Sequence, residues 1–305
     1  MSISFYVKNK KKFLGYEAVL NVETALSLLD RELYNYNTGN IDINDLLLSP
    51  VSNYQCLIIG DGKDSSRGFE LFYDNKDKYY SVRVFTPSSR EDWLLALEYI
   101  KALAKKFDSK IISETGEEYT AENIDKFDYE RDILYGIEVI SSRVKGDEPT
   151  LYSIFGINRV VSFNQEMIDK IENSDSPIDT FSNMVKEIQY LDAYSANQRF
   201  FKNKEDGRIR GAYTLTQNTR TILPYKPSVE FENSDIVKNE DIAFWDIGLV
   251  TIDGDENDKN SYNVAAYVDY DDFIKNLPEN KYRFIDASYI MVEPLNREEL
   301  LGLVK

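Results

Sequence analysis

The sequence lacks histidine altogether and contains a single cysteine, Cys56, among its 305 residues. The absence of histidine excludes Ser-His-Asp and Cys-His nucleophile activation, an imidazole general base and every zinc site that uses histidine. A single thiol also excludes an intramolecular disulfide and a cysteine-only metal cluster. Carboxylates, lysine, tyrosine and oxygen-bound metals are the chemistry that remains.

Long apolar stretches are also missing. No run approaches the roughly 18 apolar residues of a membrane span. The stretch Ile3–Val7 is too short for a signal peptide, and it precedes its lysines instead of following them. The low cysteine content is typical of a reducing compartment. We therefore expect a cytoplasmic protein that does not bind membranes.

Basic residues are outnumbered, because 36 Lys and Arg stand against 53 Asp and Glu and give a formal net charge of −17. This charge repels nucleic acid and anionic lipid, so we expect neither as a partner. It favours a basic protein partner, and the aromatic content of 13% offers residues suited to a protein interface. Acidity that serves only solubility is the alternative explanation.

The hydrophobic pattern predicts an α+β fold with mixed or antiparallel sheets and amphipathic helices packed on one face. The clearest unit spans residues 67–107, where two alternating strands flank a turn at residues 74–77 and a helix follows. One face of that helix carries Trp93, Leu97, Ile100, Ala104 and Phe107. Strands and helices elsewhere come in clusters, which argues against a doubly wound parallel sheet.

Another helix is predicted near the N-terminus. Asn21 is a suitable cap, and the apolar residues behind it recur at helical spacing. These residues are Val22, Ala25, Leu26, Leu29, Leu33 and Tyr36.

The length of the chain fits roughly two domains. The turn-rich, charged stretch Lys145–Pro149 indicates the boundary between them. We therefore expect two loosely separable α+β halves, residues 1–146 and 147–305. In the second half, a long hairpin is predicted to turn at residues 204–207.

The acidic segment at residues 253–258 is the strongest metal candidate. Asp253, Asp255 and Asn257 match the first three ligand positions of a calcium loop. However, Asp258 stands where that loop needs glycine, and Val264 stands where it needs glutamate. A solvated loop between two strands is the alternative. If the segment binds Mg²⁺ or Mn²⁺, the chain would be a carboxylate-dependent enzyme for a phosphorylated or sugar substrate.

The long hairpin carries basic residues interleaved with aromatic ones. Arg199, Lys202, Arg208 and Arg210 surround two phenylalanines and are candidate contacts for an anion or a partner. The alternative is a charged edge hairpin that prevents edge-to-edge pairing.

Two features near residue 60 favour structural roles. Cys56 lies in the apolar run at residues 54–59, which is typical of an inert core thiol. The loop at residues 60–65 contains two glycines but lacks the spacing of phosphate-binding loops, so we expect a plain surface loop.

Several stretches carry a resemblance to a known family. They are Arg67–Leu71, Tyr80–Val84, Thr86–Ser88 and Asp92-Trp93. The sequence resembles an uncharacterised family of bacterial proteins of about this full length, catalogued as a domain of unknown function. The resemblance covers essentially the whole chain and implies a bacterial, cytoplasmic setting. It supplies no activity and no catalytic residues.

These observations favour a non-catalytic binding or interaction protein for a basic partner, in the manner of immunity proteins and antitoxins. We assign no catalytic residue and no cofactor. A carboxylate-dependent, Mg²⁺- or Mn²⁺-using enzyme is the first alternative, and a structural adaptor without a ligand is the second.

Overall fold

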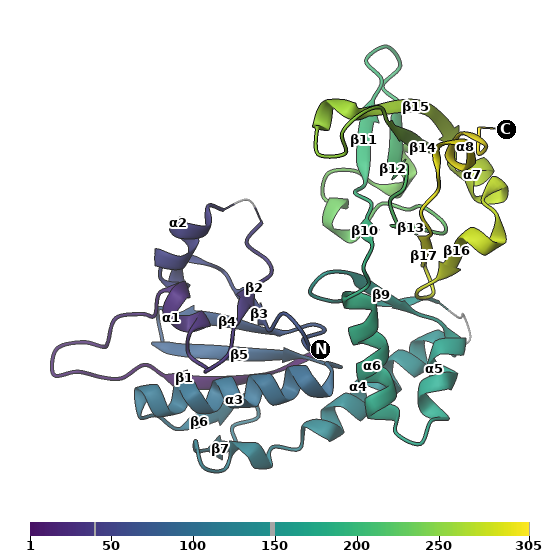
Figure 1. Cartoon of the computed structure of the whole chain (residues 1–305). Coiled ribbons are helices and arrows are strands. Elements are labelled where there is room, and N and C mark those ends of the chain that lie inside the picture. The colour runs from purple at the N-terminus through teal and green to yellow at the C-terminus, as the bar shows by residue number, and fades with distance from the viewer. Residues whose placement is uncertain (40, 147–149, 305) are drawn as a thin grey trace. The chain divides into compact units, whose positions relative to one another are not determined.

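The computed structural model describes residues 1–39, 41–146 and 150–304, and the chain divides into two compact units, Met1–Tyr190 and Leu191–Lys305 (Figure 1). The predicted α+β class is confirmed. Helices accompany sheets that are antiparallel in the first unit and mixed in the second.

The division into units falls later in the chain than the sequence indicated. The boundary expected after residue 146 borders on residues 147–149, which lie outside the described residues. Helix α4 (Tyr129–Val144) precedes that stretch and packs against two helices that follow it, α5 (Gln165–Glu172) and α6 (Pro177–Gln189). Because these helices bury their apolar faces together, the first unit extends to Tyr190.

Antiparallel strands form the main sheet of the first unit, in the order β2-β3-β4-β5-β1-β6-β7. They are β1 (Ser2–Lys8), β2 (Tyr34–Asn35), β3 (Leu57–Gly60), β4 (Phe69–Asp74), β5 (Tyr79–Phe85), β6 (Ile111–Ser113) and β7 (Glu118–Tyr119). In β1, Phe5 lies opposite Val82 of β5 and Ser113 of β6. The Phe5 side chain is fully buried, so β1 contributes to the packed face of the sheet.

The hairpin and helix expected at residues 67–107 are present as β4, β5 and α3 (Arg90–Phe107). Ser89 caps α3, because its hydroxyl accepts the Asp92 N–H at 3.2 Å. The predicted apolar stripe from Trp93 to Phe107 is buried. Trp93 packs edge-on against Phe5, with the ring centroids 6.4 Å apart. The helix therefore covers one face of the sheet, as Figure 1 shows.

Shorter elements complete the first unit. They are α1 (Val22–Leu26), α2 (Ile43–Leu48), the 3₁₀ helices η1 (Val51–Asn53) and η2 (Ile124–Lys126), and the antiparallel pair β8 (Tyr152–Phe155) and β9 (Val160–Phe163). Asn21 caps α1 as predicted, since its side chain accepts the Thr24 N–H at 2.9 Å. The predicted continuation of this helix to Tyr36 is wrong, because α1 ends at Leu26 and the chain then turns toward β2.

The second unit contains two four-stranded sheets, β10-β13-β17-β16 and β11-β12-β14-β15. The strands are β10 (Tyr194–Ser195), β11 (Arg199–Lys202), β12 (Ile209–Thr216), β13 (Thr221–Pro224), β14 (Ile242–Ile252), β15 (Tyr262–Asp269), β16 (Tyr282–Phe284) and β17 (Tyr289–Val292). The helices are η3 (Phe231–Asn233), η4 (Asn239–Asp241), η5 (Lys259–Ser261), α7 (Tyr270–Asn276), η6 (Glu279–Lys281) and α8 (Arg297–Leu301). The hairpin predicted around residues 204–207 is confirmed as β11 and β12.

Both sheets of the second unit share one core. Tyr213 and Ile247 come from one sheet, Leu223 comes from the other, and Phe273 and Leu300 come from α7 and α8.

No helix within the described ranges of either unit is both long and apolar enough to cross a membrane.

Asp132 of α4, in the first unit, has a buried carboxylate. It is 8% exposed and accepts a hydrogen bond from Thr86 Oγ1 at 2.8 Å. Burial raises the pKa of Asp132 from 3.8 to about 6, and the hydrogen bond from Thr86 offsets part of that effect. The folded chain therefore retains this proton at pH values where the unfolded chain has lost it.

We predict that the contribution of Asp132 to the free energy of unfolding falls as the pH rises from about 4 to about 6, since the native carboxyl group binds the proton more tightly. Asp132→Asn removes this titration and keeps an oxygen for Thr86. Above about pH 6 the variant should be more stable than the wild type by up to about 3 kcal/mol. The two proteins should converge below about pH 4, as measured by urea unfolding across the range. A wild type that is the more stable protein at neutral pH would contradict this assignment.

Candidate functional site

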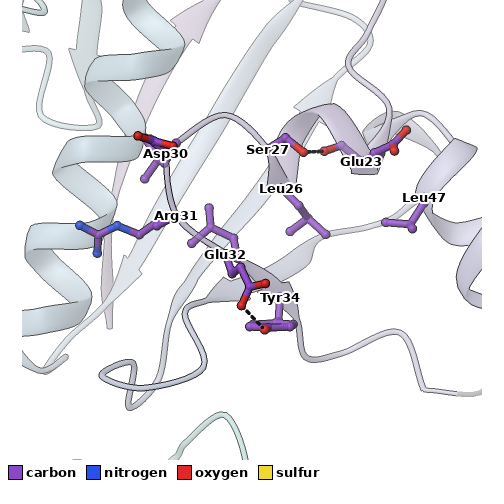
Figure 2. Close-up of a pocket in the computed structure, with 10 residues that line it drawn as sticks. Glu23, Leu26, Ser27, Asp30, Arg31, Glu32, Tyr34 and Leu47 are labelled. Carbon is purple, nitrogen blue, oxygen red and sulfur yellow. Dashed lines mark hydrogen bonds between the residues drawn. The ribbon is translucent and has the colours of Figure 1, made fainter.

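A pocket opens on the first unit where α1, the turn after it, β2 and α2 meet (Figure 2). Its volume is about 530 Å³, within the range of about 300–1,000 Å³ that is typical of ligand sites. Leu26, Leu29, Leu33 and Leu47 supply its apolar walls. Leu33 is buried, whereas the other three are half-buried and present apolar surface to an incoming group.

Acidic side chains surround these leucines. Glu23, Asp30 and Glu32 line the pocket and are exposed, and we call them the rim. Tyr34 also lines the pocket, and its hydroxyl donates a hydrogen bond to Glu32 Oε2 at 2.9 Å (Figure 2). That bond and the charge of Glu32 raise the pKa of Tyr34, so the tyrosine remains a donor that orients the Glu32 carboxylate.

Arg31 lines the pocket too, but its charge is directed elsewhere. The guanidinium forms ion pairs with Glu98 Oε2 at 2.9 Å and with Asp61 Oδ2 at 3.7 Å. Figure 2 shows the side chain extending toward α3, the helix that carries Glu98. Because neither carboxylate belongs to the lining, the rim keeps its negative charge and favours a positively charged ligand.

The end of α1 creates the pocket. Ser27 is the C-cap of the helix, and its hydroxyl and its N–H both donate to the Glu23 carbonyl, at 2.8 and 2.9 Å. Tyr34 then pairs with Gly60 of β3, which requires extended backbone. A continued helix would have put Leu29 on its buried stripe. The turn leaves this leucine half-buried instead, where it lines the pocket.

The loop at residues 61–68 is fixed by Asp92 of α3. The Asp92 carboxylate is completely buried and accepts hydrogen bonds from the N–H groups of Ser66, Arg67 and Gly68 at 3.1, 2.9 and 2.9 Å. It also accepts one from the Ser89 hydroxyl at 2.8 Å. Burial raises the pKa of Asp92, and these bonds oppose that shift. We call this set of contacts the anchor.

Arg67 places a buried positive charge beside the anchor. It is 8% exposed, and it donates from Nε to the Phe155 carbonyl at 2.8 Å and from Nη1 to the Pro87 carbonyl at 2.5 Å. Burial lowers the pKa of Arg67 to about 10, and the charge of Asp92 opposes the shift. The guanidinium therefore stays charged at neutral pH and compensates the buried carboxylate.

The anchored loop also supports the pocket. Its Asp61 pairs with Arg31, and the Asp61 carbonyl accepts a hydrogen bond from the Tyr36 hydroxyl at 3.0 Å. Gly62 lies against Tyr34, where a Cβ atom would be 3.0 Å from the nearest ring carbon. The loop is exposed at residues 62–64, as expected of a surface loop, but it is held at both ends.

The predicted metal candidates are engaged in other contacts. Asp253 forms an ion pair with Arg297 of α8, which lowers the pKa of Asp253. Asp255 accepts the Asn257 N–H at 2.9 Å, and this bond lowers the pKa of Asp255. Across the residues that the structure describes, no three Asp, Glu or Cys side chains are grouped closely enough to hold a metal ion. The segment forms an exposed loop between β14 and β15.

Arg210, one of the predicted anion contacts, is enclosed by its neighbours. Its guanidinium forms a salt bridge of 3.1 Å with Asp246 of β14. The same group lies 4.7 Å from the ring centroid of Phe201 and 4.6 Å from that of Tyr267. Its charge is therefore balanced within the sheet.

The other three predicted cations point in different directions. Arg208 precedes β12 and pairs with Asp206 at 2.6 Å. Arg199 and Lys202 are exposed on β11. Because side chains alternate along a strand, these two residues lie on opposite faces of the sheet. The structure therefore does not gather the four into one cationic surface.

Cys56 is half-buried, just before β3, with its sulfur 3.9 Å from Glu70 Oε1. Burial raises the pKa of the Cys56 thiol.

Sequence reasoning missed the pocket, because Leu26, Leu29 and Leu33 have the spacing of an ordinary helical stripe. The pairing of β2 with β3 would have revealed the pocket, but it joins residues that are far apart in the sequence.

Several of the residues that carry the family resemblance meet at the anchor. Arg67 and Gly68 supply two of its donors, Pro87 receives the Arg67 side chain, and Asp92 is its centre. A family model described as "Domain of unknown function (DUF4299)" matches residues 2–303. The chain belongs to this family. The match confirms the resemblance to an uncharacterised family of about this full length. No curated protein and no solved structure matches the chain.

We predict that Asp92→Asn lowers the free energy of unfolding by about 3 kcal/mol or more, because an amide donor then faces backbone N–H groups and Arg67 loses its counter-charge. Denaturant titration measures the loss. The matched control is Asp128→Asn at the exposed cap of α4, where the carboxylate accepts the Arg131 N–H at 3.2 Å and asparagine caps equally well. Equal losses in the two variants would show that Asp92 is an ordinary helix cap.

Proposed function

We propose that the chain is a non-catalytic binding protein and that its first unit holds a basic, amphipathic segment of a protein partner in the leucine-lined pocket. The observation that supports this is the combination of apolar walls and an acidic rim in a single pocket of about 530 Å³. The walls suit aliphatic or aromatic side chains, and the rim suits lysine or arginine beside them.

The walls and the rim make different contributions to such a complex. Each apolar side chain that the partner buries against the leucines contributes about 1.5–3 kcal/mol. Each contact with an exposed rim carboxylate contributes only about 0.2–1 kcal/mol. The leucines therefore supply most of the affinity, while the rim selects the sign of the partner's charge and accelerates its approach.

The net charge of −17 supports the same preference at longer range. Neutralisation of a basic protein by this kind of complementarity is the role that immunity proteins and antitoxins perform, and we propose a role of that class in the bacterial cytoplasm. The alternative of a metal-dependent enzyme gains no support from Asp253, which Arg297 already engages. The alternative of an adaptor without a ligand does not account for the pocket.

The rim is tested by replacing its three carboxylates together, as Glu23→Gln, Asp30→Asn and Glu32→Gln. The probe is a fluorescein-labelled Leu-Lys repeat peptide, and its binding is followed by fluorescence anisotropy. At low salt we predict that the triple variant binds about tenfold more weakly, since three exposed ion pairs are lost. The difference should shrink at high salt, which screens such pairs.

The matched control makes the same charge change in the second unit, with Glu232→Gln, Asp235→Asn and Glu240→Gln, all of them exposed residues. It should bind the probe like the wild type. In the pocket, Leu29→Ser should weaken binding at both salt concentrations, because it removes apolar contact area. If the control triple weakens binding as much as the rim triple, the probe responds to overall charge and the proposed site is wrong.

A further inference from the structure

A basic finger projects from the first unit between β1 and α1, at residues 9–17. It forms a hydrogen-bonded turn, in which the Lys12 N–H donates to the Gly15 carbonyl at 2.9 Å and the Glu17 N–H donates to the Lys10 carbonyl at 2.9 Å. Gly15 has a φ of +82°, which glycine adopts without strain. Figure 1 shows this segment, in purple, extending away from the sheet.

The base of the finger is fixed by Asn9, which is 3% exposed. Its N–H donates to the Lys78 carbonyl at 2.8 Å, and its side-chain amide donates to the Glu17 carbonyl at 2.9 Å and to the Tyr73 hydroxyl at 3.0 Å. These bonds tie both legs of the finger to the β4–β5 hairpin. The finger therefore presents its tip in a defined direction.

The tip consists of Phe13 and Leu14, which are 101% and 86% exposed. Two adjacent large apolar side chains with this degree of exposure differ from the single exposed apolar residues of an ordinary surface. Lys10, Lys11 and Lys12 directly precede them. In a chain whose net charge is −17, the tip is thus a small region of opposite charge and high apolarity.

The finger has the chemistry that the pocket selects, namely apolar side chains flanked by positive charge. Because Phe13 is fully exposed, the tip does not occupy the pocket of its own chain. We propose that the finger of one copy inserts into the pocket of a second copy, with Phe13 and Leu14 against the leucines and the lysines against the rim. This inference rests on the pocket of the proposed function and names a second copy as one of its partners.

Such a contact joins two different surfaces of the chain. Two copies that exchange fingers reciprocally form a two-fold dimer, whereas a contact that is not reciprocated generates rings or open chains. Because a partner protein would use the same pocket, self-association and partner binding exclude one another.

The test uses two variants of the full chain that each lack one half of the contact. The finger variant is Phe13→Ser with Leu14→Ser, and the pocket variant is Asp30→Lys with Glu32→Lys. In sedimentation velocity at low salt, the wild type should show masses that rise with concentration beyond the monomer. Each variant alone should remain monomeric, and an equimolar mixture of the two should form a dimer of fixed size.

That mixture is decisive, because it contains one intact finger and one intact pocket. A mixture that stays monomeric, or a wild type that stays monomeric at every concentration, overturns the inference. The matched control, Asp235→Lys with Glu240→Lys, carries the same charge change at exposed positions of the second unit and should associate like the wild type. Association that is lost in this control would show that overall charge, and not the rim, is responsible.

Two further readouts separate the competing explanations. If the Leu-Lys peptide binds the pocket while the wild type stays monomeric, the inference fails and the proposed function stands. If the peptide does not bind either, both fail. If the wild type instead sediments with phosphatidylcholine–phosphatidylglycerol vesicles and the finger variant does not, the tip is a lipid-contact loop and the second-copy inference is wrong.

Discussion

The Asp92 carboxylate holds the loop at residues 61–68 against the start of α3, and the arrangement of the first unit depends on that contact. A buried carboxylate costs several kcal/mol unless donors surround it. Here three backbone N–H groups and the Ser89 hydroxyl do so, and Arg67 supplies a compensating charge. Gly68 makes this geometry accessible, because it has a φ of +62° and a Cβ atom would lie 2.3 Å from the Ile59 carbonyl oxygen.

The effect of the anchor extends to the pocket through the same loop. Asp61 at the start of the loop pairs with Arg31, which draws that cation away from the rim. A negative pocket on the surface therefore depends on how a buried carboxylate fixes the loop behind it.

Patterns that are complete within a short stretch were predicted correctly from the sequence. The β4–β5 hairpin, the stripe of α3 and the Asn21 cap each follow from neighbouring residues. The end of α1 does not follow from neighbouring residues, because Tyr34 is extended where it pairs with Gly60, which lies far along the chain. The contacts divide the chain after Tyr190, and the charged turn after α4 gives no sign that α5 and α6 pack back onto that helix.

The charged candidate residues also depend on contacts between residues that are distant in the sequence. The sequence identified which residues are charged but not which of them are neutralised by distant partners. Arg210 is balanced by Asp246, and Asp253 is balanced by Arg297, which the sequence alone did not indicate. The rim carries exposed acidic charge on residues that the sequence assigned to an ordinary helix.

The finger and the rim are separated regions of opposite charge on one unit, and that separation links affinity to conditions. Contacts between exposed charges weaken as salt shortens the Debye length, whereas burial of Phe13 and Leu14 does not depend on charge. The rim would therefore control which ligand approaches, and the leucines would control how long it stays. Because the finger and a basic partner would need the same leucines, a partner must outcompete neighbouring copies of the chain. Effective partner affinity would then fall as the chain becomes more abundant, through mass action alone.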